Sequence, residues 1–391
     1  MHSDPIEPAA RTPSAVHYVA GPEVPAHVAR RMAGQPVFSL QRRDVSLGWI
    51  TFNRSPRSSS LATARATWNS GSAVFMPHAA EHMLEPVAAD VRAAENLMRS
   101  VVRGKDLAEL LSTPRRTRAL ADHFEMLASY QQASDQQEIS TIEFDALRTG
   151  KIIAENLWIK AAWLSYHEQD PSLRFRFSFG MADIDDVGRD RKRQRLAAEL
   201  ATQLFPECAA ITANKPLLKK LGQILGVPKL DLVERIIYFN APNGGAQFHH
   251  DVERGHRGVV FAQLSGSTFW LAIDKQALVN ELLEFLDRIE PRELKFLLPK
   301  LSMRQTLQSH ATNANDLTGF LDNPDNEPVE RIINRSPSFT RQLVERGFGF
   351  ALQRGDVLLL PQKNLRRCCW HSVFCLGKKT GEALSFAMRP K

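Results

Sequence analysis

The stretch that decides the fold is residues 244–266, GGAQFHHDVERGHRGVVFAQLSG. In it, His249 and Asp251 stand two positions apart, shortly before a run of apolar residues. Side chains at i and i+2 of a strand project from one face, so these two form a pair while His250 points to the other face. An imidazole and a carboxylate at this spacing predict two ligands of a metal ion, with a third ligand on a neighbouring strand.

The third ligand is expected much further along, in GDVLLLPQKNLRRCCWHSVFCL at residues 355–376. A Gly-Asp turn and a buried strand that ends in proline precede His371, which opens the next strand. Together with His249 and Asp251 it would form the facial triad that holds non-haem Fe(II) and leaves positions open for co-substrate and oxygen. The alternative is a group of histidines on a hydrated turn, and His256 fits that description best.

Three segments in this order carry a resemblance to a known family. The HxD pair, the following FAQLSGSTFWLAI and the later GDVLLLP…WH.V resemble the JmjC and cupin-like branch of the Fe(II)/2-oxoglutarate oxygenases. The resemblance covers residues 230–391. It implies a double-stranded β-helix (jelly-roll/cupin) core, Fe(II) held by the three residues above, 2-oxoglutarate as co-substrate and O2 as oxidant. The implied reaction is hydroxylation of an unactivated C–H bond.

The sequence departs from this family at the position that anchors 2-oxoglutarate. Many JmjC-type hydroxylases have a Lys two positions after the glycine of this strand, whereas this chain has Thr268. In the wider superfamily the anchor is an Arg on the strand after the last iron ligand, and EALSFAMR supplies Arg389. Alternation puts Ser385 on the same face as Arg389. Hydroxyl contacts to the co-substrate are then expected from Thr268, Ser385 and Tyr238. The alternative for Arg389 is a solvated residue near the chain end.

The rest of the chain predicts an α+β protein in three parts. Residues 1–35, rich in Pro and Ala without periodicity, predict a flexible leader. Residues 36–229 predict a mostly helical N-terminal region with some strands packing on the core, because helical periodicity runs from about 78 to 133. Residues 230–391 predict the catalytic barrel from short β-branched and aromatic runs, with a helical insertion at 276–350.

A second candidate metal motif lies in MPHAAEHML, where His78, Glu81 and His82 spell H-x-x-E-H. On a helix this spacing would place two imidazoles on one face for Zn²⁺, with the glutamate as general base. The flanking sequence is typical of a surface helix, and the later acidic residues Glu138 and Glu155 are unremarkable as a third ligand. A chance match is therefore the favoured interpretation.

Composition limits the classes of function. The chain has 391 residues, of which 43% are hydrophobic, enough for a large core. No apolar run reaches membrane-spanning length and no signal peptide is evident, so a cytoplasmic protein is expected. Four cysteines without CxxC pairing are expected to be packing residues. The net charge is +7, and the basic residues are dispersed apart from RDRKRQR, which begins an amphipathic helix. No nucleic-acid partner is therefore expected.

Three functions remain open. The first is an Fe(II)/2-oxoglutarate oxygenase acting on a small molecule or an amino-acid or peptide side chain, with the small molecule favoured because no peptide-reading module is recognisable. The second is a cupin-type metal enzyme that does not use 2-oxoglutarate, for which the missing Lys argues. The third is a non-catalytic binding protein on the same barrel. In each case the N-terminal region and the insertion are expected to build the ligand pocket or a homodimer interface.

Overall fold

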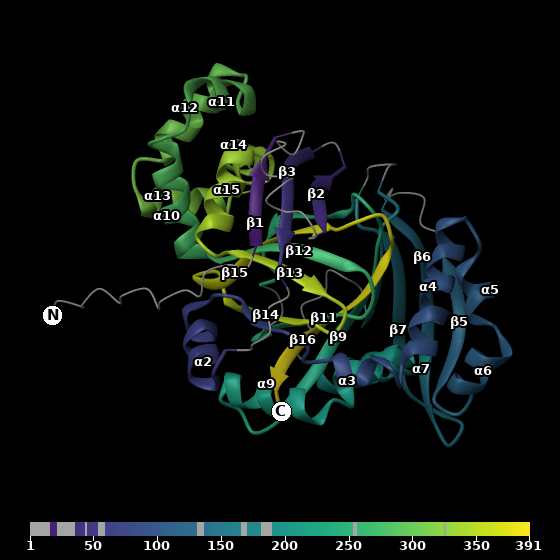
Figure 1. Ribbon diagram of the computed structural model, residues 1–391. Helices are drawn as coiled ribbons and strands as arrows, with labels where there is room; N and C mark the ends of the chain where they lie inside the picture. Colours follow the sequence, from purple (N-terminus) through teal and green to yellow (C-terminus); the bar gives the residue numbers. More distant parts are fainter. Residues whose placement is uncertain are drawn as a thin grey trace.

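The structure is a computed structural model that describes residues 16–21, 36–43, 45–53, 59–130, 137–165, 170–180, 190–252, 256–323 and 326–391. It combines helices with a large antiparallel β structure, consistent with a β-sandwich or jelly-roll arrangement (Figure 1). No helix in these described ranges is long and apolar enough to cross a membrane.

The centre of the molecule consists of two facing antiparallel sheets from the C-terminal part of the chain. One has the order β9–β16–β11–β14 and the other the order β10–β15–β12–β13, and a β14–β15 pairing joins them. The first strand begins at residue 230, where the barrel is predicted to start. The strands are β9 (Leu230–Asn240), β10 (Gly245–His249), β11 (Gly258–Gln263), β12 (Ser267–Asp274), β13 (Gly349–Gln353), β14 (Val357–Asn364), β15 (Arg367–Cys375) and β16 (Gly381–Pro390).

Apolar side chains fill the space between these two sheets. Phe261 of β11 packs edge-on against Trp270 of β12 with 4.6 Å between ring centroids, and Tyr238 of β9 lies 6.3 Å from the Phe261 ring. Other members of this inner cluster are Val259, Ala272, Leu352, Leu358, Leu360, Cys369 and Ala383. The described inner walls of the two sheets are therefore largely apolar.

The first sheet continues beyond β9 through four strands that lie towards the right of Figure 1. Helices cover one face of this extension, and α7 packs on β7, β8 and β9. The strands are β8 (Leu173–Phe179), β7 (Lys151–Trp163), β6 (Glu138–Arg148) and β5 (Phe124–Tyr130). The helices between residues 61 and 225 are α2 (Leu61–Ser70), α3 (Glu81–Leu84), α4 (Ala88–Val102), α5 (Leu107–Leu111), α6 (Pro114–Leu120), α7 (Arg191–Leu204), η2 (Pro206–Cys208), α8 (Ala209–Thr212) and α9 (Lys215–Leu225).

Local signals explain where α9 starts and stops. The side chain of Asn214 accepts a hydrogen bond from the Leu217 amide, which satisfies one of the free donors at the helix start. A proline follows in the first turn, and Gly226 ends the helix with a left-handed φ of 69°. Signals within a few residues of each end therefore set both boundaries of α9.

Strands occupy more of the described N-terminal region than predicted, although helices remain its larger part. Helical periodicity predicts a helix through FEMLASY, but these residues form β5, hydrogen-bonded to β6. Their burial alternates from Phe124 onward. The local pattern fits either a helix or a strand, and hydrogen bonding to β6 decides for the strand. The helix predicted around residues 79–102 is also interrupted, and its two parts are α3 and α4.

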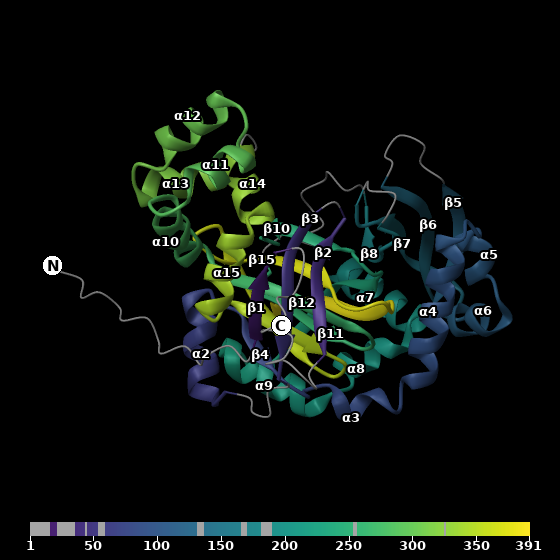
Figure 2. The ribbon, with the colours of Figure 1, turned by 45° about the horizontal axis from the view of Figure 1, so that its top comes forward.

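Part of the predicted flexible leader is ordered. Residues Val16–Ala20 form β1, which pairs with β3 (Val45–Phe52) in a small sheet that also contains β2 (Val37–Arg42). Figure 2 shows this sheet lying across the barrel near α15. Hydrogen bonds to β3 and burial of Val16 hold β1 in place. Residues 1–15 and 22–35 of the expected leader lie outside the described ranges. The short strand β4 (Val74–Met76) pairs with β14.

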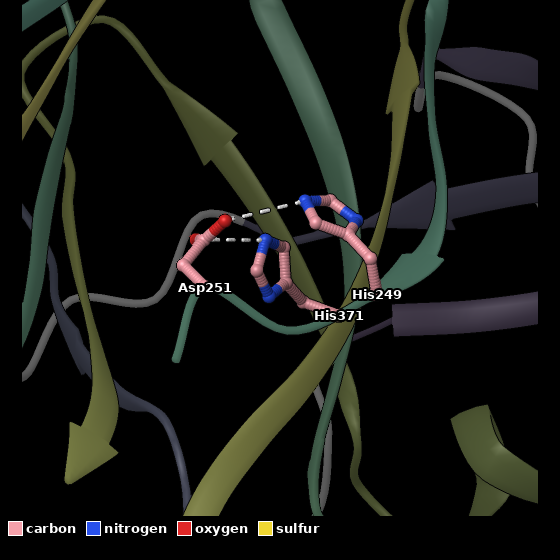
Figure 3. Close-up of side chains that lie close together, drawn as sticks. All are labelled: His249, Asp251 and His371. Atoms are coloured by element: carbon pink, nitrogen blue, oxygen red, sulfur yellow. Dashed lines mark ion pairs between the residues drawn. The ribbon is translucent and has the colours of Figure 1, made fainter. Parts of the chain in front are cut away.

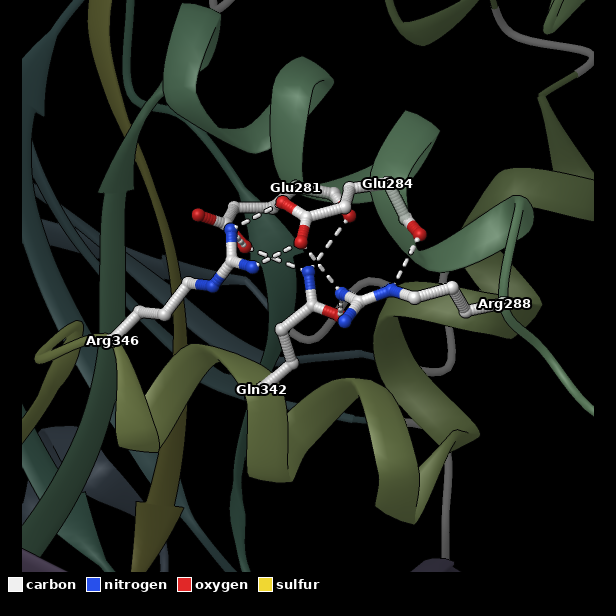
Figure 4. Close-up of polar contacts among 5 residues, drawn as sticks. All are labelled: Glu281, Glu284, Arg288, Gln342 and Arg346. Atoms are coloured by element: carbon white, nitrogen blue, oxygen red, sulfur yellow. Dashed lines mark hydrogen bonds and ion pairs between the residues drawn. The ribbon is translucent and has the colours of Figure 1, made fainter.

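The helical insertion lies between β12 and β13, as predicted for residues 276–350. A polar cluster ties its first helix to its last (Figure 4), since Arg346 reaches both Glu281, at 2.9 Å, and Glu284. Gln342 donates to the Glu281 carboxylate at 2.7 Å. The helices are α10 (Lys275–Leu286), α11 (Pro291–Leu297), α12 (Leu301–His310), α13 (Ala314–Leu321), α14 (Glu327–Arg335) and α15 (Pro337–Glu345).

Gly245 fixes the approach of β10 to β15. Its φ is 137°, and an added Cβ would lie 2.0 Å from the Val373 carbonyl oxygen. Gly245→Ala is therefore expected to destabilise the protein by roughly 1–3 kcal/mol in urea denaturation, through backbone strain and displacement of β10. Gly319→Ala in α13 is the control, because open space surrounds that glycine, and it should gain about 0.5–1 kcal/mol. Equal effects of both changes would contradict this assignment.

Two buried carboxyl groups predict a pH effect on stability. Burial and the neighbouring Glu207 raise the pKa of Glu382 well above its ordinary value, and burial raises the pKa of Glu207 to about 7. The folded state thus holds protons that the unfolded chain releases near pH 4.5, and this stabilisation is lost as the pH rises through about 7. In urea denaturation at pH 8, the free energy of unfolding of Glu382→Gln should be higher than that of the wild type by at least about 1 kcal/mol. At pH 5 the difference should be much smaller. Parallel pH profiles would contradict the prediction.

Candidate metal centre

The pairing of β10 with β15 brings three predicted residues together. His249 and His371 are direct cross-strand partners, and Asp251 follows two residues after His249. Figure 3 shows the Asp251 carboxylate facing both imidazoles, with Oδ1 3.6 Å from Nε2 of His249 and Oδ2 3.6 Å from Nε2 of His371. The three ligand atoms lie within 4.8 Å of one another. Within the described ranges, no other group of three His, Cys, Asp or Glu side chains converges in this way.

Backbone carbonyls orient both imidazole rings. Nδ1 of His249 is 2.7 Å from the carbonyl oxygen of Gln247, and Nδ1 of His371 is 3.4 Å from that of Cys369. A carbonyl only accepts hydrogen bonds, so in each ring Nδ1 carries the proton and donates it. The lone pair is then on Nε2, the atom that faces Asp251. This is the arrangement that outer partners give to metal-binding histidines.

The surroundings keep His371 and Asp251 in the protonation states that bind metals. His371 is 4% exposed and stacks on Trp270, with 5.4 Å between ring centroids. Burial lowers the pKa of His371 to about 4, so the ring is neutral at pH 7. Burial acts to raise the pKa of Asp251, but the nearby His371 and His249 outweigh it and hold that pKa below its usual range. The centre therefore offers the neutral imidazole of His371 and the carboxylate of Asp251, with the His249 imidazole beside them.

One side of the centre is open to solvent. The side chains of His249 and Asp251 are 43% and 41% exposed, whereas His371 forms the buried wall against the inner cluster. A ligand can therefore reach the three residues from the side of His249 and Asp251.

The hydroxyl groups predicted to contact a co-substrate lie on the inner walls. Thr268 is fully buried, and its hydroxyl donates to Gln263 and accepts from the Trp270 indole, each at 2.9 Å. Ser385 lies opposite Phe261 in the β11–β16 pairing, and the Tyr238 ring packs on Phe261. Burial and then the Asp251 charge raise the pKa of Tyr238 to about 12. The Thr268 hydroxyl serves the side-chain network of β11 and β12.

The structure does not bring Arg389 to the three residues. Its guanidinium donates to Gln194 of α7 at 2.7 Å, and α7 covers the outer face of the sheet. Strand alternation correctly places Ser385 on the inner face, but Arg389, next to the last residue of β16, reaches Gln194 instead.

The remaining histidines lie apart from the centre. His250 packs edge-on against Trp370 with 5.2 Å between centroids, and His256 is buried 3.7 Å from Glu234. In the rival motif, His78 sits in a turn before α3 with a φ of 59°, and its ring meets Glu81 at 2.6 Å. H-x-x-E-H is therefore not on one helical face, in agreement with the favoured interpretation as a chance match. The four cysteines are buried free thiols, as predicted.

Sequence reasoning missed two cations near the centre. LRFRFSFGM alternates charged and aromatic residues and predicts a strand with one buried face, which β8 confirms. This alternation does not predict which strand pairs with β8. In the structure β8 pairs with β9, so that Arg174 lies directly opposite Tyr238 and Arg176 opposite Ile236.

Comparisons with known proteins give loose structural neighbours. No family model matches the chain, and no curated protein matches it by sequence. An oxidoreductase of the 2OG-Fe(II) oxygenase family from Burkholderia pseudomallei aligns with a TM-score of 0.31 and 9% identity, over 86% of this chain and 92% of that one. The ribosomal oxygenase YcfD from Escherichia coli, in complex with cobalt and succinic acid, aligns with a TM-score of 0.24 and 12% identity, over 66% and 41%. Overlaps this loose do not transfer a function.

Proposed function

We propose that this protein is an oxygenase that holds Fe(II) through His249, Asp251 and His371, uses 2-oxoglutarate as co-substrate and hydroxylates an unactivated C–H bond. The observation that carries the proposal is that the three ligand atoms, brought together by the β10–β15 pairing, lie within 4.8 Å of one another. The strand order of the two facing sheets supports a double-stranded β-helix as the scaffold.

The donor atoms and the spacing of these three residues suit an iron ion. Two atoms that each lie about 2.1 Å from one ion are at most about 4.2 Å apart, so separations of 3.6 Å suit a shared ion. Two imidazoles and one carboxylate form the donor set of non-haem Fe(II) sites with open positions. When bound, the iron supplies the oxygen chemistry, with 2-oxoglutarate as the source of two electrons.

The protein's own residues then set the conditions of the reaction. Asp251 supplies the negative charge, and His371 supplies a neutral donor without proton release at pH 7, beside the backbone-oriented imidazole of His249. Trp270 and Phe261 pack behind His371 and exclude water from that side. Substrate enters from the exposed side of His249 and Asp251.

One observation favours a second candidate, a cupin-type metal-dependent oxygenase that does not use 2-oxoglutarate. The described inner walls of the two sheets carry hydroxyl, aromatic and aliphatic side chains, and Arg389 is engaged by Gln194. A buried co-substrate carboxylate without a cation would be costly. This candidate keeps the metal centre and replaces only the co-substrate.

Anaerobic titration with Fe(II), with and without 2-oxoglutarate, tests both candidates. The proposal expects one Fe(II) per chain and a visible charge-transfer band when 2-oxoglutarate is added. Iron binding without that band would contradict the use of 2-oxoglutarate and favour the second candidate. Absence of iron binding would contradict both and leave a non-catalytic binding protein. His250→Ala is the matched control, because His250 neighbours the centre without facing Asp251.

A further inference from the structure

Arg174 of β8 continues the inner surface of the barrel. Directly opposed residues of neighbouring antiparallel strands share a face, with Cβ atoms about 4.5–5.5 Å apart. Arg174 opposes Tyr238, and Tyr238 in turn opposes Ala383 of β16, a member of the inner cluster. The guanidinium therefore belongs to the face of the sheet that looks towards the metal centre.

Ring contacts lead from this arginine to the metal centre. Tyr238 lies 6.3 Å from Phe261, Phe261 lies 4.6 Å from Trp270, and Trp270 stacks on His371 at 5.4 Å. The charge of Asp251 also contributes to the raised pKa of Tyr238, as expected for close neighbours. Arg174 is the cross-strand neighbour of Tyr238, so Tyr238 lies near both Arg174 and the charge of Asp251.

Arg174 differs from the other cations on the same face in its partners. Arg176 lies 3.7 Å from Glu234, and Lys160 lies 3.6 Å from Glu138 and over the Trp158 ring. Arg174 is half-buried, and within the described ranges no carboxylate lies within 4.0 Å of it. A half-buried guanidinium that has no carboxylate partner is suited to bind an anion, and its planar fork matches a carboxylate.

We propose that Arg174 binds a carboxylate of the molecule that reaches the metal centre, so that this site takes an organic acid. The inference rests on the proposed function, because it assumes that His249, Asp251 and His371 form the reacting centre. The carboxylate belongs either to 2-oxoglutarate or to the substrate that is hydroxylated, and the chemistry of recognition is the same for both. The Tyr238 hydroxyl, protonated at neutral pH, is a second donor on this face.

The test compares wild type, Arg174→Gln and Arg174→Lys with Arg148→Gln, which changes an exposed arginine at the end of β6. In the first arm, anaerobic Fe(II)-loaded protein is titrated with 2-oxoglutarate and with 2-oxopentanoate, which lacks the distal carboxylate. In the second arm, binding of L-glutamate and L-glutamine to protein loaded with Fe(II) and 2-oxoglutarate is measured by calorimetry. Circular dichroism verifies the fold of each variant.

The two arms distinguish the source of the carboxylate. If the carboxylate belongs to the co-substrate, Arg174→Gln lowers the affinity for 2-oxoglutarate about 100-fold and leaves the affinity for 2-oxopentanoate unchanged. Arg174→Lys then recovers part of the lost affinity. If it belongs to the substrate, wild type prefers the acid to the amide and Arg174→Gln removes the preference. An Arg174→Gln variant that matches Arg148→Gln in both arms would overturn the proposal. Failure of wild type to bind Fe(II) would instead reject the proposed function, and calorimetry with glutarate on metal-free protein still tests Arg174.

Discussion

Replacing His371 with alanine is expected to abolish tight metal binding while the chain stays folded. His371 is the one buried ligand of the three, and its cross-strand partner His249 and the exposed Asp251 cannot supply a third donor. Loss of an outer partner of a ligand typically costs about 10- to 100-fold in metal affinity, and loss of the ligand itself should exceed that. Equilibrium dialysis with Fe(II) or Co(II) measures the change directly.

The matched control for this experiment is His250→Ala. It removes an imidazole next to the centre that packs on Trp370 and does not face Asp251, so metal affinity should change little. Equal losses in the two variants would show that general disturbance of β10 and β15, rather than removal of a ligand, explains the effect. Retention of full affinity in His371→Ala would contradict the ligand assignment.

The largest expected effect on stability comes from Arg42→Ala. Arg42 ends β2 with 1% exposure and donates to the Ala246 carbonyl at 2.6 Å and to the Ser372 hydroxyl at 2.7 Å. It also donates to Asn334 of α14 at 3.2 Å and lies over the ring of Phe374. One side chain thus joins the small sheet, β10, β15 and the insertion. The loss should be roughly 3 kcal/mol, since hydrogen bonds to charged groups contribute about 1.5–3 kcal/mol each and do not add fully.

Urea denaturation of Arg42→Ala and of Arg148→Ala tests this prediction. Arg148 is exposed, so its replacement should change the free energy of unfolding by less than about 0.5 kcal/mol. A small effect of Arg42→Ala would mean that water or a rearranged Asn334 replaces the guanidinium without cost. Arg42→Ala is also expected to weaken metal binding, because two of its partners flank His249 and His371 in β10 and β15.

Local patterns were sufficient to locate the candidate centre. Alternation selects His249 and Asp251 over His250, and the apolar strand before His371 makes it the cross-strand partner, as the β10–β15 register shows. The strands from residue 230 onward and the helical insertion follow from the same short-range patterns. These features depend on neighbours within a few residues, which is the range that periodicity reports.

Features that depend on distant pairing escaped the sequence. Nothing in FEMLASY reveals that β6 will pair with it, and nothing in LRFRFSFGM places Arg174 opposite Tyr238. Arg42 lies in a short stretch whose charge suggests the surface, but contacts with Ala246 and Asn334 bury it. Arg389, near the end of β16, likewise meets Gln194 of α7, almost two hundred residues away in the sequence. Each of these outcomes is decided by tertiary contacts that one sequence does not encode locally.

The most direct test of the account is anomalous X-ray scattering from crystals soaked in Co(II). We expect one strong anomalous peak between Nε2 of His249, Nε2 of His371 and the Asp251 carboxylate. The peak should lie about 2.0–2.2 Å from each ligand atom, as in zinc sites with the same ligands. The peak should be missing in His371→Ala crystals and present in His250→Ala crystals. A wild-type crystal with no peak at this point, or with its ion beside His78 and Glu81, would contradict the account.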